Sequence, residues 1–344
     1  MRIARRSVTL LCTLGTLTAL VAFRSAVIAS GAGSGLQPSA SRPDHLMLAV
    51  VRTDGVLLPF AAYNGRKWSA PWPTLYPGAS VELPVNFDSV PRDWWGGEAP
   101  GPWQLWTPLA DKPRSLTLSS PVMVPIGLAR QLGFRTNQPP VLPLAPPFEL
   151  PFPKLGLAVA GEAPLTPIVS VSPLSPVHKD FNARLRQGFE QAEEKTIGTI
   201  RGTSRWTHPF KRDVRAQVPF TLEAWYVTSL ATGDERMSYV EAAKKYPVKP
   251  EDDGCGLETF VSGWVHHDEA RQKMKVKLNA VVTYCDRRGV SYMLPFGQIR
   301  VNDRVHWVVQ MSGRDHEWYA VVEATPGRAR FVAEHQAGWL SLHR

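Results

Sequence analysis

The last quarter of the chain alternates apolar and polar residues with a period of two. The clearest case is residues 273–284, where one face is apolar and the opposite face starts with three lysines. The apolar face consists of Met274, Val276, Leu278, Ala280, Val282 and Tyr284. Successive side chains of a strand point to opposite faces of a sheet, so this pattern predicts a half-buried antiparallel strand.

The same alternation recurs along the rest of this region. It appears at residues 290–296, 305–311 and 318–322, with turn sequences at 286–289, 312–315 and 326–327. Residues 257–265 precede it as a further apolar run, and Phe331 marks a last short strand. Together these segments predict one long antiparallel meander from Leu257 onward.

Two helices are expected before this meander. Ser175 and Pro176 have the residue types of an N-cap and a first helical position, which predicts an amphipathic helix over residues 177–196. Its apolar positions are Val177, Phe181, Leu185, Phe189 and Ala192. A second, shorter helix is expected to begin at Ser238, where Glu241 has capping-box spacing, and to end before Pro247. We expect the long helix, the proline-rich half or both to cover the apolar face of the meander.

The N-terminal half is limited by its prolines, because residues 71–176 hold 22 of the 31 in the chain. Proline lacks a backbone donor, so short edge strands are favoured over long interior ones. The candidate strands are residues 103–107, 115–118, 132–136 and 155–160. Before them, residues 46–68 contain Asp-Gly and Asn-Gly turns between apolar runs, which predict a compact β-meander. No second copy of this meander follows, so a propeller is not supported.

The densest proline segment is residues 139–153, where seven prolines alternate with large apolar residues. A solvated linker would not carry so many apolar groups. We therefore expect an extended strap packed on a domain surface. The alternative is a peptide motif for a proline-binding module.

The N-terminus has the layout of an export signal. Arg2, Arg5 and Arg6 precede sixteen uncharged residues at 8–23, and small residues follow at 29–34. We expect a signal peptide over residues 1–29, which places the protein in the periplasm, in the cell envelope or outside the cell. Two alternatives remain: an uncleaved membrane anchor formed by residues 8–23, and a twin-arginine address.

Removal of residues 1–29 would change the charge of the chain. Four arginines and no acids leave with them, so the net charge falls from +9 to +5. The remaining charges are spread along the sequence, whereas a nucleic-acid interface needs a focused basic patch. No nucleic-acid partner is therefore expected, and membrane contact is expected only through an uncleaved N-terminus.

We predict a mainly β (α+β) fold in two domains. A flexible leader at residues 30–44 precedes a Pro/Trp-rich β domain at residues 45–163. An α+β domain with the antiparallel meander and one long amphipathic helix follows at residues 164–344.

Cys255 and Cys285 bracket the strands expected at 257–265 and 273–284. A hairpin whose paired positions sum to 540 would set Phe260 opposite Ala280, Trp264 opposite Val276 and the two cysteines opposite each other. Because an exported protein meets an oxidising compartment, we predict a disulfide between Cys255 and Cys285. The spacing of these cysteines matches neither a redox motif nor a zinc site.

Tryptophans cluster in a loop rich in glycine and proline. Aromatic faces on loops stack against sugar rings, and nearby carboxylates bond hydroxyl groups. The candidate ligand-binding residues are Asp93, Trp94, Trp95, Glu98, Trp103 and Trp106. Packing of tryptophan against proline explains the same residues without a ligand, and a glycosidase pair of Asp93 and Glu98 has no fixed separation.

A second cluster, His266, His267, Asp268 and Glu269, holds four side-chain types that bind metals. Consecutive strand residues point to opposite faces, so a solvated hairpin tip is the favoured interpretation and no metal or other cofactor is expected. A nucleophile elbow, a P-loop and a dinucleotide fingerprint are absent from the sequence. The sequence therefore favours a non-enzymatic exported protein that binds a glycan, an envelope component or a protein partner. The alternative is a secreted hydrolase acting on saccharide or peptide material.

Overall fold

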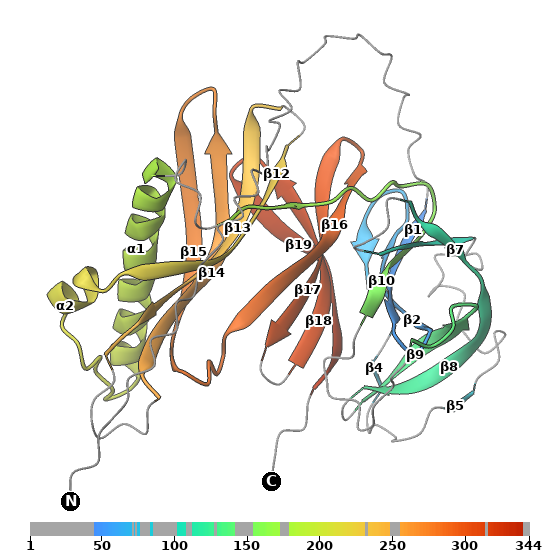
Figure 1. Ribbon diagram of the computed structural model, residues 1–344, viewed down its shortest axis with the longest axis horizontal. Coiled ribbons are helices and arrows are strands. Elements are labelled where there is room, and N and C mark those ends of the chain that lie inside the picture. The colour runs from blue at the N-terminus through green and yellow to red at the C-terminus, as the bar shows by residue number, and fades with distance from the viewer. Residues whose placement is uncertain are drawn as a thin grey trace, which may run out of the picture. The chain divides into compact units, whose positions relative to one another are not determined.

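The computed structural model describes most of the chain after residue 44. The described residues are 45–70, 72, 74–75, 83–84, 102–107, 112–126, 129–141, 154–172, 179–230, 233–247, 255–313 and 316–339. The expected signal peptide, the leader and most of the expected strap lie outside them. Within the described residues the fold is mainly β, and its strands form three antiparallel sheets (Figure 1).

Sheet A contains the first ten strands. They are β1 (Leu46–Arg52), β2 (Val56–Tyr63), β3 (Trp68–Ser69), β4 (Thr74–Leu75), β5 (Leu83–Pro84), β6 (Trp103–Trp106), β7 (Arg114–Leu116), β8 (Leu118–Ile126), β9 (Ala129–Thr136) and β10 (Lys154–Ala160). Their main order is β5-β8-β9-β2-β1-β10-β6-β7, with β3 paired to β2 and β4 to β9. The predicted β1–β2–β3 meander and the candidate strands at 103–107, 132–136 and 155–160 are confirmed, whereas residues 115–118 are divided between the end of β7 and the start of β8.

One strand of sheet A is longer than the prolines suggested. Strand β8 has nine residues and contains Pro121 and Pro125, although short strands were expected here. Its partner on one side, β5, pairs only with Val122 and Met123, so most of that edge is free of ladder hydrogen bonds to β5. A strand tolerates proline at an unpaired edge or at a bulge, and β8 also has a register shift between Leu118 and Ser120.

Sheet C follows in the order β11-β12-β13-β14-β15. Its strands are β11 (Val169–Ser170), β12 (Phe220–Ser229), β13 (Glu235–Lys245), β14 (Leu257–Asp268) and β15 (Lys273–Tyr284). The helix expected from Ser238 is wrong, because these residues form β13. Residues Ser238 to Lys244 are all buried, and burial on both faces of a central strand overrides the local capping-box signal.

The long helix is confirmed, with different ends. Helix α1 (Lys179–Thr203) runs seven residues beyond the expected end, and its expected cap at Ser175 lies outside the described residues. Leu185 and Phe189 are fully buried against sheet C, where Val276 and Leu278 of β15 are among their partners. Gly188 lets the helix approach closely, since a Cβ there would lie 2.6 Å from Val276 Cγ1. A short helix that was not predicted, α2 (Arg212–Gln217), follows α1.

The disulfide between Cys255 and Cys285 is confirmed, with a Cα–Cα distance of 5.2 Å. The predicted register beside it is wrong by one residue, because Phe260 pairs with Val281 rather than Ala280. Cys255 precedes the first residue of β14, so the disulfide does not fix the pairing. Both faces of β14 carry large apolar side chains. A shift of the pairing by one residue exchanges the two faces, so the apolar pattern does not select one register.

That slip decides which face of β14 meets the helix. Val265 pairs with Val276 and packs on the α1 side of sheet C. Trp264 pairs with Lys277 and lies on the other side, 5.1 Å from the ring of Trp307. The register expected from the sequence set Trp264 opposite Val276 on one apolar face, and the structure overturns it.

Sheet B contains the last four strands in sequential order. They are β16 (Ser291–Val301), β17 (Arg304–Gly313), β18 (His316–Thr325) and β19 (Arg328–Trp339). The single meander expected from Leu257 is therefore divided between two sheets at the β15–β16 connection. The expected turns at 286–289 and 326–327 fall between successive strands, as predicted. Of the turn expected at 312–315, the first two residues are the end of β17 and the other two lie outside the described residues.

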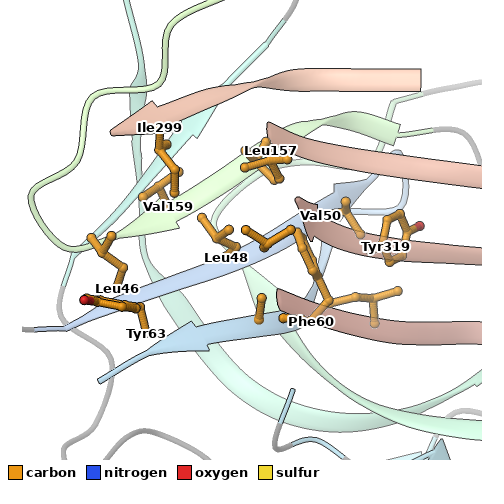
Figure 2. Close-up of a cluster of buried hydrophobic side chains, with 14 of the residues drawn as sticks. Leu46, Leu48, Val50, Phe60, Tyr63, Leu157, Val159, Ile299 and Tyr319 are labelled. Atoms are coloured by element: carbon orange, nitrogen blue, oxygen red, sulfur yellow. The ribbon is translucent and has the colours of Figure 1, made fainter. Parts of the chain in front are cut away.

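Sheet B packs on both of its faces. Trp307 and Val309 of β17 contact Tyr239 of sheet C in one buried cluster. Val308 of the same strand belongs to a cluster with Phe60 and Leu48 of sheet A. Figure 2 shows this second cluster, in which Tyr319 of sheet B lies near Phe60. The layers are therefore α1, sheet C, sheet B and sheet A, and the expected domain boundary at residue 163 falls between β10 and β11.

Candidate functional site

A pocket of about 460 Å³ lies between sheet A and sheet B. Sheet A supplies the end of β2, the β2–β3 turn and the start of β3. Sheet B supplies the β16–β17 turn and parts of β17, β18 and β19. The lining residues are Tyr63, Arg66, Lys67, Trp68, Val301, Asn302, Arg304, His306, Glu323, Arg330, Phe331 and Val332.

The β2–β3 turn sets two cations at the mouth of this pocket. Asn64 Oδ1 accepts hydrogen bonds from the backbone of Arg66 at 3.2 Å and of Lys67 at 3.0 Å. Gly65 has a φ of 80°, which a residue with a side chain rarely adopts. The Asn-Gly pair that predicted this turn therefore also positions Arg66 and Lys67, whose side chains are exposed.

The β16–β17 turn forms the opposite wall. Asn302 and Asp303 have φ values of 49° and 60°, as a tight two-residue hairpin requires. Asn302 Nδ2 donates to the hydroxyl of Tyr63 at 2.7 Å, and that hydroxyl donates to the carbonyl of Gly65 at 3.0 Å. This chain of bonds ties the two sheets together beside the pocket.

Glu323 anchors two arginines at the pocket. Its side chain is 8% exposed and accepts from Arg304 Nη1 and Arg330 Nη2, both at 2.7 Å. Burial alone would raise the pKa of Glu323, but the hydrogen bonds from the two guanidinium groups outweigh it and hold the pKa below its ordinary value. The arginine side chains stay 62% and 51% exposed, so their outer N–H groups face solvent.

His306 lies beside Glu323 in the β17–β18 ladder and is almost completely buried. Its ring centroid lies 5.6 Å from that of Trp68, and its Nδ1 lies 3.2 Å from the carbonyl oxygen of Arg304, which can only accept a hydrogen bond. Burial lowers the pKa of His306 to about 4, although Glu323 opposes this shift. The imidazole is therefore neutral at pH 7 and does not add to the charge of the pocket.

The pocket carries an excess of positive charge. Arg66, Lys67, Arg304 and Arg330 line it against one carboxylate, Glu323, which gives a net charge of +3 with His306 neutral. Asp303 is exposed in the adjacent turn but does not line the pocket. Within the described part of the chain, neither Arg66 nor Lys67 has an ion-pair partner.

The lining offers binding groups rather than a catalytic set. The lining residues include no serine, threonine or cysteine, and the Tyr63 hydroxyl is already hydrogen-bonded. Glu323 is occupied by two arginines, and a carboxylate of lowered pKa is a weak base. The arrangement can hold an anion or a polar ligand, and it has no activated nucleophile.

The sequence pointed to a different place, the tryptophan-rich loop. Trp103 is 1% exposed in the core of sheet A, and Trp106 is half-buried against the cluster between sheets A and B. The positions of these two side chains fit packing within the fold. Asp93, Trp94, Trp95 and Glu98 lie outside the described residues, so their role stays a prediction.

The His266–Glu269 cluster lies at the end of β14. Asp268 is buried there and accepts from the backbone and side chain of Arg271, at 2.9 and 3.0 Å. It therefore caps the hairpin turn that leads to β15. Among the described residues, no group of three or more His, Cys, Asp or Glu side chains is placed to hold a metal ion.

The pocket was missed because its residues come from distant segments. The signal in the sequence was a set of charged residues on otherwise apolar strands. Arg304 and His306 lie two apart on β17, Glu323 lies opposite His306 on β18, and Arg330 lies opposite Glu323 on β19. Only the strand order brings these positions together.

A second charged cluster joins the two helices to sheet C. Glu193 of α1 accepts from the hydroxyl of Tyr246 and lies 3.6 Å from both Arg215 and Lys244. Arg215 also pairs with Glu194. Glu193, Arg215 and Lys244 are buried while Glu194 is partly exposed, and the ion pairs of Arg215 join α2 to α1.

Comparison with known proteins gives no further guide. No family model matches the sequence, and neither a curated protein nor a solved structure shows significant similarity to the chain. Among the described residues, no helix is both long and apolar enough to cross a membrane.

Proposed function

We propose that this chain is an exported, non-enzymatic binding protein that acts in the periplasm, in the cell envelope or outside the cell. Its partner is a glycan, an envelope component or a protein, and its ligand enters the pocket between sheets A and B. The observation that carries the proposal is the pocket itself, where exposed donors converge around a wall tied together by Tyr63 and Asn302.

Two features support export. The N-terminal sequence has the basic tip, apolar run and small residues of a signal peptide. The Cys255–Cys285 disulfide agrees with an oxidising compartment, since such bonds are rare in the cytosol. Mass spectrometry of the exported protein should find a new N-terminus near Ser30, whereas an intact Met1 in the envelope would establish the anchor alternative.

The alternative of a secreted hydrolase rests on His306 and Glu323, which lie opposite each other at the pocket. Catalysis would need a free base beside a nucleophile or a water site. Here the carboxylate holds two arginines and the imidazole is packed against Trp68. Both groups are committed to structure, which favours binding.

Blocking the pocket tests the binding role. The Lys67 side chain is exposed and has no ion-pair partner among the described residues, so Lys67→Trp should fill the pocket mouth without disturbing the fold. We expect the purified protein to retain solubilised envelope glycans and the variant to lose at least tenfold in retention. Equal retention by the variant, with an unchanged melting temperature, would overturn the pocket as the binding site.

A further inference from the structure

We infer, on the basis of the binding role proposed above, that the ligand carries an anionic group on a saccharide unit and that Arg304, Arg330, Arg66 and Lys67 hold this group. Glu323 is a positioning residue, which fixes the two guanidinium groups in the pocket. The shared chemistry of the ligand is a carboxylate or a phosphate attached to a sugar-sized body.

The donors for this anion are present and unused. A guanidinium group has five N–H donors, and Arg304 and Arg330 each spend one of them on Glu323. Both side chains are more than half exposed. The remaining donors are held near a fixed position by the buried carboxylate, so a ligand need not order two free side chains.

The charge of the pocket selects an anion over a neutral molecule. Glu323 neutralises one of the four cations, and the other three charges have no counter-ion in the lining. A half-enclosed site is screened less than an open surface, so the attraction exceeds that of scattered surface lysines. Charge-assisted hydrogen bonds from arginine to carboxylate or phosphate are also the strong class of hydrogen bond.

The size and the apolar part of the pocket favour a small body over a polymer backbone or a membrane. A volume of about 460 Å³ lies in the range of small-molecule pockets. Phe331 lines it with an exposed ring, and Val332 lies next to Phe331 in the lining. An aromatic face beside hydrogen-bond donors suits a sugar ring, which has both C–H and hydroxyl faces.

Three small probes separate the possible ligands: glucuronate, glucose 6-phosphate and glucose. We expect titration calorimetry on the exported protein to detect one or both anionic sugars, at least tenfold tighter than glucose. Preference for glucuronate would identify a carboxylate as the natural group, and preference for glucose 6-phosphate would identify a phosphate.

The variant Arg66→Gln with Lys67→Gln removes two charges from exposed positions without ion-pair partners among the described residues. We expect about tenfold weaker binding of the anionic probe, because each lost cation removes a charge-assisted contact. Arg184→Gln with Lys195→Gln is the matched control, since it removes the same charge from exposed positions on α1. Equal weakening in both variants would overturn the inference.

Glu323→Gln tests the positioning role. The substitution makes the pocket more positive by one charge, so simple attraction predicts tighter binding. We expect weaker binding, a smaller difference between the two anionic probes, and partial rescue by Glu323→Asp. Tighter binding by the Gln variant would overturn the positioning role.

The inference and the proposed function can fail separately. If all three sugars bind equally and Lys67→Trp abolishes their binding, the pocket is a binding site but its ligand is not selected by charge. If none of the three probes binds, the inference is overturned. The proposed function is overturned only if Lys67→Trp also leaves envelope retention unchanged.

Discussion

The interface between sheets A and B, here called the seam, holds charged side chains at both of its ends. One end is open to solvent and the other is closed to it. The open end is the pocket, with Arg66, Lys67, Arg304, Arg330, Glu323 and His306. The closed end holds Arg52, Asp54, Lys154, Glu317 and Tyr319. Strand β1 connects them, because its first residue pairs with Tyr63 and its last with Lys154.

The closed end is balanced and buried. Lys154 donates to Glu317 at 2.6 Å, and their side chains are only 10% and 12% exposed. Burial lowers the pKa of Lys154, against the opposing influence of Glu317, and raises that of Tyr319. Two cations meet two carboxylates here, so this end needs no outside partner. The open end has an excess of cations and retains solvent access. We therefore interpret the closed end as a clamp, meaning a set of buried ion pairs that holds the two sheets together, and the open end as a binding site.

The largest expected effect comes from breaking the closed end. Lys154→Met leaves Glu317 buried without its cation, so we expect unfolding in urea to show a loss of about 3–4 kcal/mol. Adding Glu317→Gln should restore much of the stability, because the amide carries no charge and can still accept from Tyr319. A loss below about 1 kcal/mol for Lys154→Met would show that the closed end is not a clamp.

The second effect concerns the free energy of unfolding at acid pH. It is tested with one histidine from the open end and one from the closed end. Burial lowers the pKa of both His306, in the pocket, and His335, opposite Tyr319, to about 4 in the folded protein. The unfolded chain takes up these protons near pH 6.5, so the stabilising contribution is complete above pH 6.5 and is lost as the pH falls toward 4. Each group contributes at most about 3 kcal/mol.

His306→Gln should therefore reduce the loss of stability between pH 6.5 and pH 4, measured by urea unfolding at each pH. His335→Gln is the matched comparison and should reduce it by a similar amount. An unchanged pH profile in the His306 variant would mean that His306 is protonated in the folded protein as easily as in the unfolded chain. The open end would then be more hydrated than the packing of His306 against Trp68 indicates.

The third effect is smaller and lies at the open end. Arg330→Gln removes a half-exposed cation but leaves Glu323 bonded to Arg304. We expect a loss of about 1 kcal/mol in the free energy of unfolding, because exposed ion pairs contribute little and the carboxylate keeps one partner. A loss as large as that of Lys154→Met would erase the distinction between the two ends.

The sequence predicted the strands of both regions better than it predicted how they meet. Alternation of apolar and polar residues indicated β15 to β18, and Asn-Gly and Asp-Gly indicated the first turns, because these are local signals. The capping-box spacing of Ser238 and Glu241 predicts a helix at β13, because this strand buries polar as well as apolar residues and shows no clear period of two. The register of β14 failed for the same reason, as Trp264 and Val265 suit either face.

The pocket could not be predicted from local patterns. Trp68 and His306 touch across two sheets, and Glu323 collects arginines from strands on either side of it. Tryptophans set among glycine and proline give a stronger local signal in the sequence, but Trp103 of that set is part of the core. A charged residue on an otherwise apolar strand is a weaker sequence signal than a tryptophan cluster, and in this fold such charged residues line the pocket.

The smallest effect on stability is expected where the effect on binding is large. Arg66→Gln with Lys67→Gln should change the free energy of unfolding by less than about 0.5 kcal/mol, because the turn depends on Asn64 and Gly65 rather than on these side chains. The melting temperature should match that of the Arg184→Gln, Lys195→Gln control. A clear loss of stability would mean that Arg66 and Lys67 form ion pairs with an anionic group of the protein itself. In that case the positive charge of the pocket is already neutralised by the chain itself, and the two ends of the seam are clamps of the same kind.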